Sequence, residues 1–418
     1  MEMFLEFFKS DSFVSFILAI LTIILFLFLC KKYKLTKYQI LIFVLIILFW
    51  FSVVLIRTYR KNFAEEEEKM SAIKDNIWKI ILIIIAVGLI VSLIGFLMGA
   101  KRWIYINDKG GISIVDTSKE ITVNDFALDS FTSMEIDADS ADVEIIISDK
   151  YGIEATYFDK KDNPVWKVEN NVLKVDYPQK DTLMLFNFNL SFNFKNSKLK
   201  IYLPQDAELG EADIKLSYGK VKIDELKVKE LSIKNSFGDV NINNITAEDI
   251  KLTLSSGKFN VSNITAKEIT AKNSYGAGYF KTVTTDRLSV KMSSGDLSLT
   301  GCTIGALDIK NSYGAVNCQD IVSGGTDINV SSGAIRLKGD LSGSTTVESS
   351  FGKITMELLK SKEEYNYNIS TSFGSIMMDD EKMGGGPIGS PIVNTGGAAG
   401  NTLKISAASG SIDIAFNK

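Results

Sequence analysis

The stretch that decides the fold is residues 235–276, NSFGDVNINNITAEDIKLTLSSGKFNVSNITAKEITAKNSYG. Within it a glycine recurs every 19 residues, and each time a serine stands two positions before the glycine. The same pair continues at the same interval on both sides. The glycines of the series are Gly219, Gly238, Gly257, Gly276, Gly295, Gly314, Gly333 and Gly352. Eight in-phase copies indicate a repeat architecture, in which each unit packs mainly against its neighbours.

Apolar residues follow the same interval. Val240 and Ile242 stand two and four residues after their glycine, and Ile250 and Leu252 stand twelve and fourteen after it. Spacings of two indicate strands with one buried face. Neither strand is long enough to be stable alone, so copies must stack with like strands parallel, about 4.8 Å apart. We therefore predict an all-β fold, a single-stranded β-solenoid (β-helix) of 19-residue rungs. Val240, Phe259 and Leu297 should line one internal ladder.

The corner of each rung carries two further signals. The recurring glycine predicts a positive φ at a tight turn. One residue before it, aromatic and small side chains alternate from rung to rung. The series begins Phe237, Ser256, Tyr275, Ser294, Tyr313, Ser332 and Phe351. We interpret it as large over small packing that fills a stacked corner. A binding role for the aromatic row is the alternative.

The first part of the chain contains three long apolar stretches, about 13–29, 40–56 and 77–98. Each is close to the roughly 20 residues that a helix needs to cross a bilayer. The sequence thus predicts a membrane anchor over 1–103 with three transmembrane helices, preceding the solenoid. Two helices plus an interfacial segment remain the alternative. The expected location is a multi-pass protein of the cell membrane, with the lipid bilayer as a partner. Basic residues in the two intervening loops nearly cancel, so they do not fix the orientation.

The rest of the chain divides into two further regions. Residues 104–204 are expected to form a β-rich N-terminal cap and first irregular rungs, because terminal units of solenoids are atypical. Residues 205–418 hold the repeats, with a glycine-rich insertion at about 383–400. A final capping rung is expected to contain the apolar residues Ile405, Ile412, Ile414 and Phe416.

Composition argues against several functions. The chain has no histidine, a net charge of -4 and a pI of about 5.3. It therefore lacks the commonest general base and metal ligand, and it has no basic surface for nucleic acid. The cysteines are Cys30, Cys302 and Cys318. The last two occupy apolar repeat positions, which predicts buried thiols. We predict no catalytic residues, no metal and no cofactor, and the sequence leaves any ligand-binding residues unknown. A β-helical enzyme acting on polysaccharide, with carboxylates in a groove, is a minor alternative.

The rungs have the form S-[SFY]-G-x-[VIL]-x-[IVL], with the tripeptide I-T-A between strands at 245–247 and 264–266. This pattern resembles the bacterial β-strand-repeat "putative adhesin" family over roughly residues 130 to 418. The resemblance implies a non-enzymatic protein of the bacterial cell envelope with the solenoid on the outer face. Its partners would be envelope proteins or cell-wall polymers. We therefore expect an adhesin-like or scaffold protein. An accessory protein of an envelope stress response, which binds a membrane partner, is the alternative.

Overall fold

A computed structural model describes most of the chain beyond residue 101. The described residues are 102–106, 112–116, 120–158, 163–177, 197–385, 392–394 and 400–417. The three predicted membrane helices lie outside them. Within them the one helical element is the short 3-10 turn η2 (Lys362–Glu364), and no helix is long and apolar enough to cross a membrane. On that finding the predicted location is corrected. A multi-pass membrane protein needs several helices of about 20 apolar residues.

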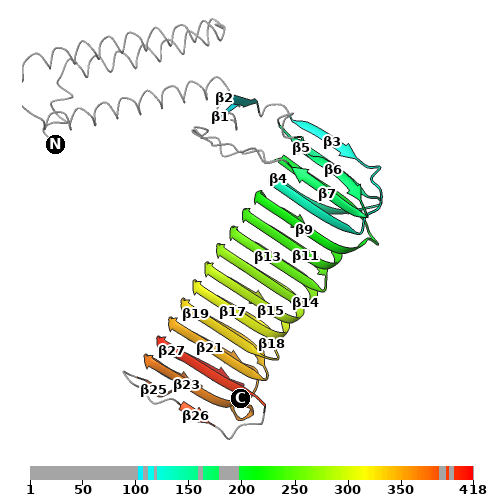
Figure 1. The fold of residues 1–418 in the computed structure, drawn as a ribbon. Helices are drawn as coiled ribbons and strands as arrows, with labels where there is room; N and C mark the ends of the chain where they lie inside the picture. Colours follow the sequence, from blue (N-terminus) through cyan, green and yellow to red (C-terminus); the bar gives the residue numbers. More distant parts are fainter. Residues whose placement is uncertain are drawn as a thin grey trace, which may run out of the picture. The chain divides into compact units, whose positions relative to one another are not determined.

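Parallel strands stack along the described chain, each rung contributing two legs (Figure 1). The first legs are β10 (Val221–Ile223), β12 (Val240–Thr246), β16 (Leu297–Thr300), β18 (Val316–Ser323), β20 (Ile335–Leu341) and β22 (Ile354–Leu358). The second legs are β9 (Glu208–Tyr218), β11 (Leu226–Phe237), β13 (Asp249–Ser256), β17 (Thr303–Tyr313), β19 (Thr326–Ser332) and β21 (Ser344–Phe351). Two strands run through both legs, β14 (Phe259–Tyr275) and β15 (Gly278–Ser294).

The register between rungs is the predicted 19 residues. Val240 pairs with Phe259, Phe259 with Gly278, and Gly278 with Leu297. Val240, Phe259 and Leu297 are fully buried, so the predicted internal ladder is confirmed. Gly278 interrupts the apolar series because a Cβ there would overlap the ring of Phe259. That ring meets Phe280 edge to face, with centroids 5.3 Å apart.

The recurring glycines have the positive φ that the sequence predicts, for example 138° at Gly257. A Cβ on Gly257 would also overlap the carbonyl oxygen of Gly238 in the preceding rung. Glycine is therefore required twice at this corner, by conformation and by space. A second corner lies six residues later, where Asn263 has φ 54° and Gly301 has φ 62°. Asparagine, aspartate and glycine favour this left-handed conformation, a signal that apolar periodicity alone does not reveal.

At the N-terminal end the order of rungs in space differs from their order in the chain. The rung next to β9 and β10 is β4 (Ser133–Ser148), and β7 (Val172–Tyr177) and β8 (Ser197–Pro204) lie on its outer side. Antiparallel strands follow. They are β5 (Gly152–Tyr157) on β8, β3 (Ile121–Asp125) on β5, and β6 (Val165–Glu169) on β7. They end the parallel stack, which limits edge-to-edge pairing. β1 (Arg102–Ile106) and β2 (Ile112–Asp116) form a separate antiparallel pair.

The C-terminal end shows the same exchange of order. β27 (Thr402–Ser409) lies between β21 and β23 (Asn366–Phe373), and β28 (Ile412–Phe416) lies between β22 and β24 (Ser375–Met378). The expectation that the C-terminal segment forms the final capping rung is therefore wrong. The outermost rung is β23–β24, and its edges are covered by two antiparallel strands, β26 (Ile392–Asn394) and β25 (Glu381–Gly385). Both strands lie in or next to the segment expected to be an inserted loop.

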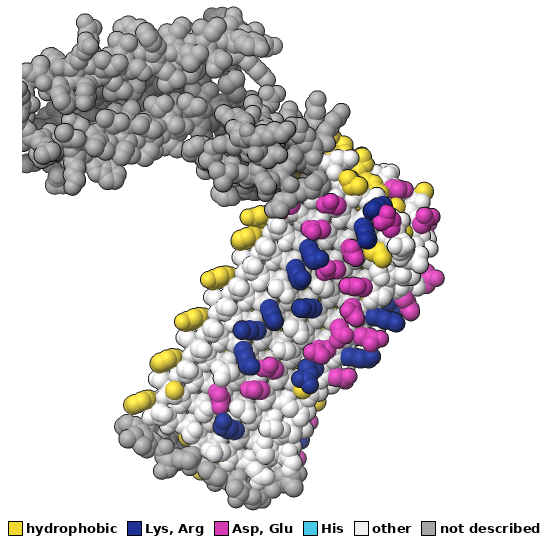
Figure 2. Space-filling view, viewed as in Figure 1, with side chains coloured by type: hydrophobic (Ala, Val, Ile, Leu, Met, Phe, Trp, Pro, Cys, Tyr) yellow, Lys and Arg dark blue, Asp and Glu magenta, His cyan; other side chains and the backbone are white. Residues whose placement is uncertain are grey.

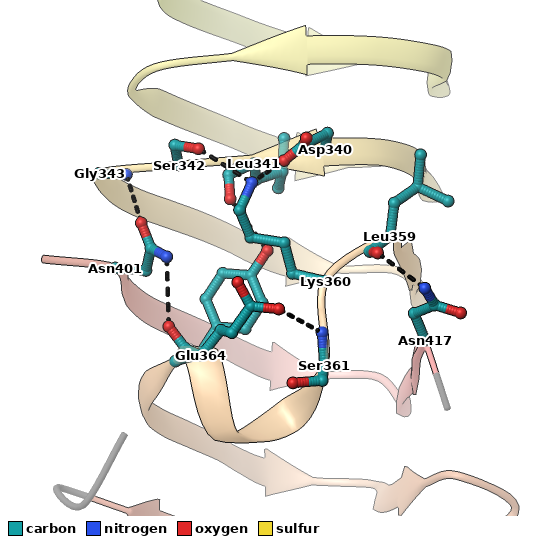
Figure 3. A network of polar contacts seen from close by, with 11 residues as sticks. Asp340, Leu341, Ser342, Gly343, Leu359, Lys360, Ser361, Glu364, Asn401 and Asn417 are labelled. Atoms are coloured by element: carbon teal, nitrogen blue, oxygen red, sulfur yellow. Dashed lines mark hydrogen bonds and ion pairs between the residues drawn. The ribbon is translucent and has the colours of Figure 1, made fainter. Parts of the chain in front are cut away.

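A polar network holds the inserted C-terminal rung in place (Figure 3). Asn401 accepts a 3.0 Å hydrogen bond from the Gly343 amide and donates one of 3.2 Å to the carbonyl of Glu364. The hydroxyl of Tyr365, which is fully buried, donates to the carbonyl of Leu341 at 2.9 Å. These bonds join segments that are far apart in the sequence, and no 19-residue pattern predicts them.

Candidate binding surfaces

A row of aromatic side chains projects from one edge of the solenoid (Figure 2). We define the aromatic row as Tyr218, Phe237, Tyr275, Tyr313, Phe351 and Phe373. Each has between 49% and 65% of its surface exposed. The interpretation of these rings as packing inside the corner is therefore wrong. The alternative that the sequence left open, a surface available for binding, matches their position.

The direction of the chain at the corner explains why the rings are exposed and not buried. Asn273 is buried, whereas Tyr275, two residues later, is exposed. Residues two apart share a face only while a strand continues. Here the strand ends at Tyr275, and its pairing with the neighbouring rungs is interrupted at Ser274, so the two side chains leave on opposite sides.

Buried asparagines fix the corners of three of the six aromatic rungs. The side-chain amides of Asn235, Asn273 and Asn311 donate to the carbonyls of Gly219, Gly257 and Gly295, at 2.8, 2.9 and 3.1 Å. Rungs without an aromatic residue have an apolar side chain at the same position. These residues are Leu254, Met292 and Val330. In these six rungs the inner position thus alternates between amide and aliphatic groups, and the outer one between rings and serines. In the rungs of Tyr218, Phe351 and Phe373 the inner residues are Leu216, Ser349 and Thr371.

The strand register gives the order of the outer positions along the edge. From the middle of the solenoid to its C-terminal end they are Ser256, Tyr275, Ser294, Tyr313, Ser332, Phe351, Ser409 and Phe373. Successive rings are therefore two rungs apart, about 9.6 Å at the usual strand spacing. Tyr218 and Phe237 instead occupy adjacent rungs and stack, with centroids 5.0 Å apart and an angle of 8° between the rings.

Comparison with protein families shows the family of the chain. The family model described as Toastrack DUF4097 matches residues 131–270 and again 248–415. The chain belongs to the Toastrack DUF4097 family. The match covers the rungs that carry the aromatic row, and it confirms the resemblance to bacterial β-strand-repeat adhesins. No curated protein matches this Toastrack chain.

Several solved structures are similar to this Toastrack chain at low identity. A "putative cell adhesion protein" from Clostridium sporogenes is 14% identical, with 72% of this chain and 100% of that chain covered and a TM-score of 0.19. A "putative adhesin" from Bacteroides fragilis is 15% identical, covers 72% and 98%, and has a TM-score of 0.28. A "putative lipid binding protein" from Parabacteroides distasonis is 15% identical, covers 72% and 98%, and has a TM-score of 0.32.

Charged side chains of the Toastrack rungs lie on the face beside the row that Figure 2 shows. Lys267 bridges to Glu248 of the preceding rung at 2.9 Å, and this hydrogen bond raises the pKa of the lysine and lowers that of the glutamate. Such exposed pairs contribute little to stability. Lys272, Lys291 and Lys310 follow one another in adjacent rungs and form a basic stripe.

Two open depressions of the described Toastrack solenoid are lined by carboxylates, the groups that a β-helical enzyme acting on polysaccharide would need. One, about 390 Å³, is lined by Glu135, Asp137, Asp176 and Asp213, with lysines among them. The other, about 540 Å³, is lined by Glu268, Arg287 and Asp308 among others. Among the described residues no group of three or more His, Cys, Asp or Glu could hold a metal ion. Cys302 and Cys318 are buried, as predicted, and burial raises the pKa of the Cys318 thiol to about 12.

Proposed function

We propose that the chain is an adhesin-like binding protein, a solenoid that holds a macromolecular partner through the aromatic row and carries out no chemical step. The exposure of six aromatic side chains along one edge carries this proposal. Aromatic residues are enriched in interfaces, and exposed apolar surface of this kind is typical of interaction sites. The expected partners are envelope proteins or wall polymers.

The repeat supports a binding role because its backbone hydrogen bonds hold the rings at a set spacing before any partner binds. The backbone beside each ring is hydrogen-bonded to the next rung, for example Gly257 N to the Tyr275 carbonyl at 2.9 Å and Gly295 N to that of Tyr313 at 2.8 Å. The spacing of the rings is therefore set before a partner arrives. A preorganised surface loses less conformational entropy on binding, which strengthens the complex.

A bead-retention experiment tests the proposal. Beads carrying the purified full-length chain are applied to one surface coated with the same chain and to another coated with peptidoglycan. The perturbed protein is a variant with serine at Tyr275, Tyr313, Phe351 and Phe373, because serine already occupies the intervening rungs. We expect wild-type beads to be retained on at least one surface, and retention there to fall at least tenfold in the variant.

The matched control replaces Lys272, Lys291 and Lys310 with serine, which removes the basic stripe and leaves the aromatic row intact. This control should retain the beads as the wild type does. Equal retention of the wild type and the four-serine variant, or no retention of the wild type on either surface, contradicts the proposal.

A further inference from the structure

The outer positions of the last eight rungs alternate without exception. In the order in which the register stacks them, each of Tyr275, Tyr313, Phe351 and Phe373 is preceded by a serine, and Ser256 begins the series. The series begins with a serine and ends with a ring, so in the reversed order each ring stands where a serine stood and each serine where a ring stood. A row of this kind is complementary to its own reverse.

The gaps between these rings have a defined thickness. Tyr218 and Phe237, one rung apart, stack face to face with centroids 5.0 Å apart. Rings from adjacent rungs can thus fill the edge completely. Where a serine takes the place of a ring, the neighbours above and below stand about 9.6 Å apart. The gap therefore has room for one aromatic ring from outside, in the stacking that Tyr218 and Phe237 already adopt.

A two-fold axis between the rungs of Tyr313 and Ser332 uses every gap. It sets Tyr313 opposite Ser332, Tyr275 opposite Ser409, Phe351 opposite Ser294 and Phe373 opposite Ser256. Parallel copies would instead set ring against ring, and a one-rung shift of parallel copies leaves no closed dimer. The antiparallel arrangement is the closed solution that seats each of the four rings in a gap.

The residues beside the row suit the same axis. Ala315 and Ala334, which follow the glycines nearest the axis, are small and neutral. One rung further out on either side, the same column holds exposed Asp296 and exposed Lys353, and the lysine also pairs with Asp413 of its own chain at 3.2 Å. The axis brings Asp296 of one copy opposite Lys353 of the other, so opposite charges meet across the contact.

We propose that the partner of the aromatic row is the same row of a second copy, antiparallel, with the rings of each copy seated in the serine gaps of the other. This inference rests on the proposed function and names its partner. Eight rings at about 100–150 Å² each bury about 1,000 Å², the lower end for a specific interface. A single pair of chains therefore associates weakly, and firm adhesion needs many copies acting together.

Site-directed crosslinking of the full-length chain tests the arrangement, in a Cys30→Ser background that leaves only the buried native thiols. Ser331→Cys lies beside the axis, so two copies bring their thiols within reach of a short bismaleimide. Ser255→Cys occupies the same exposed column, but the axis separates its two copies by about 34 Å. We expect the dimer yield of Ser331→Cys to exceed that of Ser255→Cys at least tenfold.

Filling one gap separates self-recognition from other uses of the row. Ser332→Tyr adds a ring that can stack as Tyr218 and Phe237 do, so the fold tolerates it, but it blocks entry of the partner's Tyr313. Crosslinking through Ser331→Cys should then fall at least tenfold. Equal yields at both cysteine positions, or undiminished crosslinking with Ser332→Tyr, overturn the proposal. If beads still bind peptidoglycan through the aromatic row, the proposed function stands and only self-recognition fails.

Discussion

Gly257→Ala tests the reasoning about the corners in the middle of the solenoid. At this position φ is 138°, a conformation that residues with a Cβ rarely adopt. Holding alanine there costs about 1–3 kcal/mol. The new Cβ would also overlap the Gly238 carbonyl oxygen of the preceding rung.

Relief of that overlap must move one rung away from the next. The bonds at risk run from Gly238 N to the Ser256 carbonyl, 3.0 Å, and from Val240 N to the Lys258 carbonyl, 2.9 Å. Each contributes about 1 kcal/mol. Together with the backbone strain, the expected loss is about 3–5 kcal/mol, a large part of the 5–15 kcal/mol that stabilises a typical domain.

Urea unfolding of the full-length chain, followed by circular dichroism, measures the loss. The matched control is Gly301→Asn. Gly301 has φ 62°, no atom lies within 4 Å of the position of its Cβ, and Asn263 holds the same corner of another rung. The control should change stability by less than about 1 kcal/mol. If Gly257→Ala is no more destabilising than this control, the steric account of the repeat is refuted.

Three further outcomes are expected. Burial raises the pKa of Tyr365 to about 12 from its ordinary 10, so its folded state retains the proton longer. The contribution of Tyr365 to the free energy of unfolding is therefore complete below pH 10 and decreases by about 2–3 kcal/mol towards pH 12. Denaturant midpoints measured over this pH range should show that the Tyr365→Phe variant lacks this decrease. In a Cys30→Ser chain, Cys302 and Cys318 should react with maleimide only after unfolding, a result that mass spectrometry can check. Asn273→Ala removes a buried hydrogen bond and should lower the free energy of unfolding by about 1–3 kcal/mol, measured from the urea midpoint. Asn273→Leu introduces the side chain that the preceding rung has at this position, so it should lower the free energy of unfolding by less.

The regular part of the fold could be predicted because one physical rule repeats in it. Buried side chains recur at a fixed interval, so the spacing of Val240, Phe259 and Leu297 is enough to identify a ladder. The rung order at the ends could not be predicted, because it depends on single contacts such as those of Asn401 and Tyr365. Such contacts occur once and leave no period.

The candidate surface is visible in the sequence, but the sequence predicts the wrong side for it. Tyr275 and Tyr313 alternate with serines, and the two-residue rule for strands predicts that their rings point inward. That rule fails at the corner, since the pairing between rungs is interrupted at Ser274, between the buried and exposed positions. The left-handed corner at Asn263 is a second local feature, set by one residue's backbone preference and not by burial.

Distances between spin labels test the stacking of 19-residue rungs most directly. Positions 234, 310 and 329 share one outward column in the register, with Lys310 four rungs and Asn329 five rungs from Lys234. Labels on cysteines at 234 and 310 should lie about 19 Å apart, and labels at 234 and 329 about 24 Å apart. Pulsed electron paramagnetic resonance that finds an increment of about 5 Å per rung supports the account. Distances that do not grow with the number of repeats between the labels would contradict it.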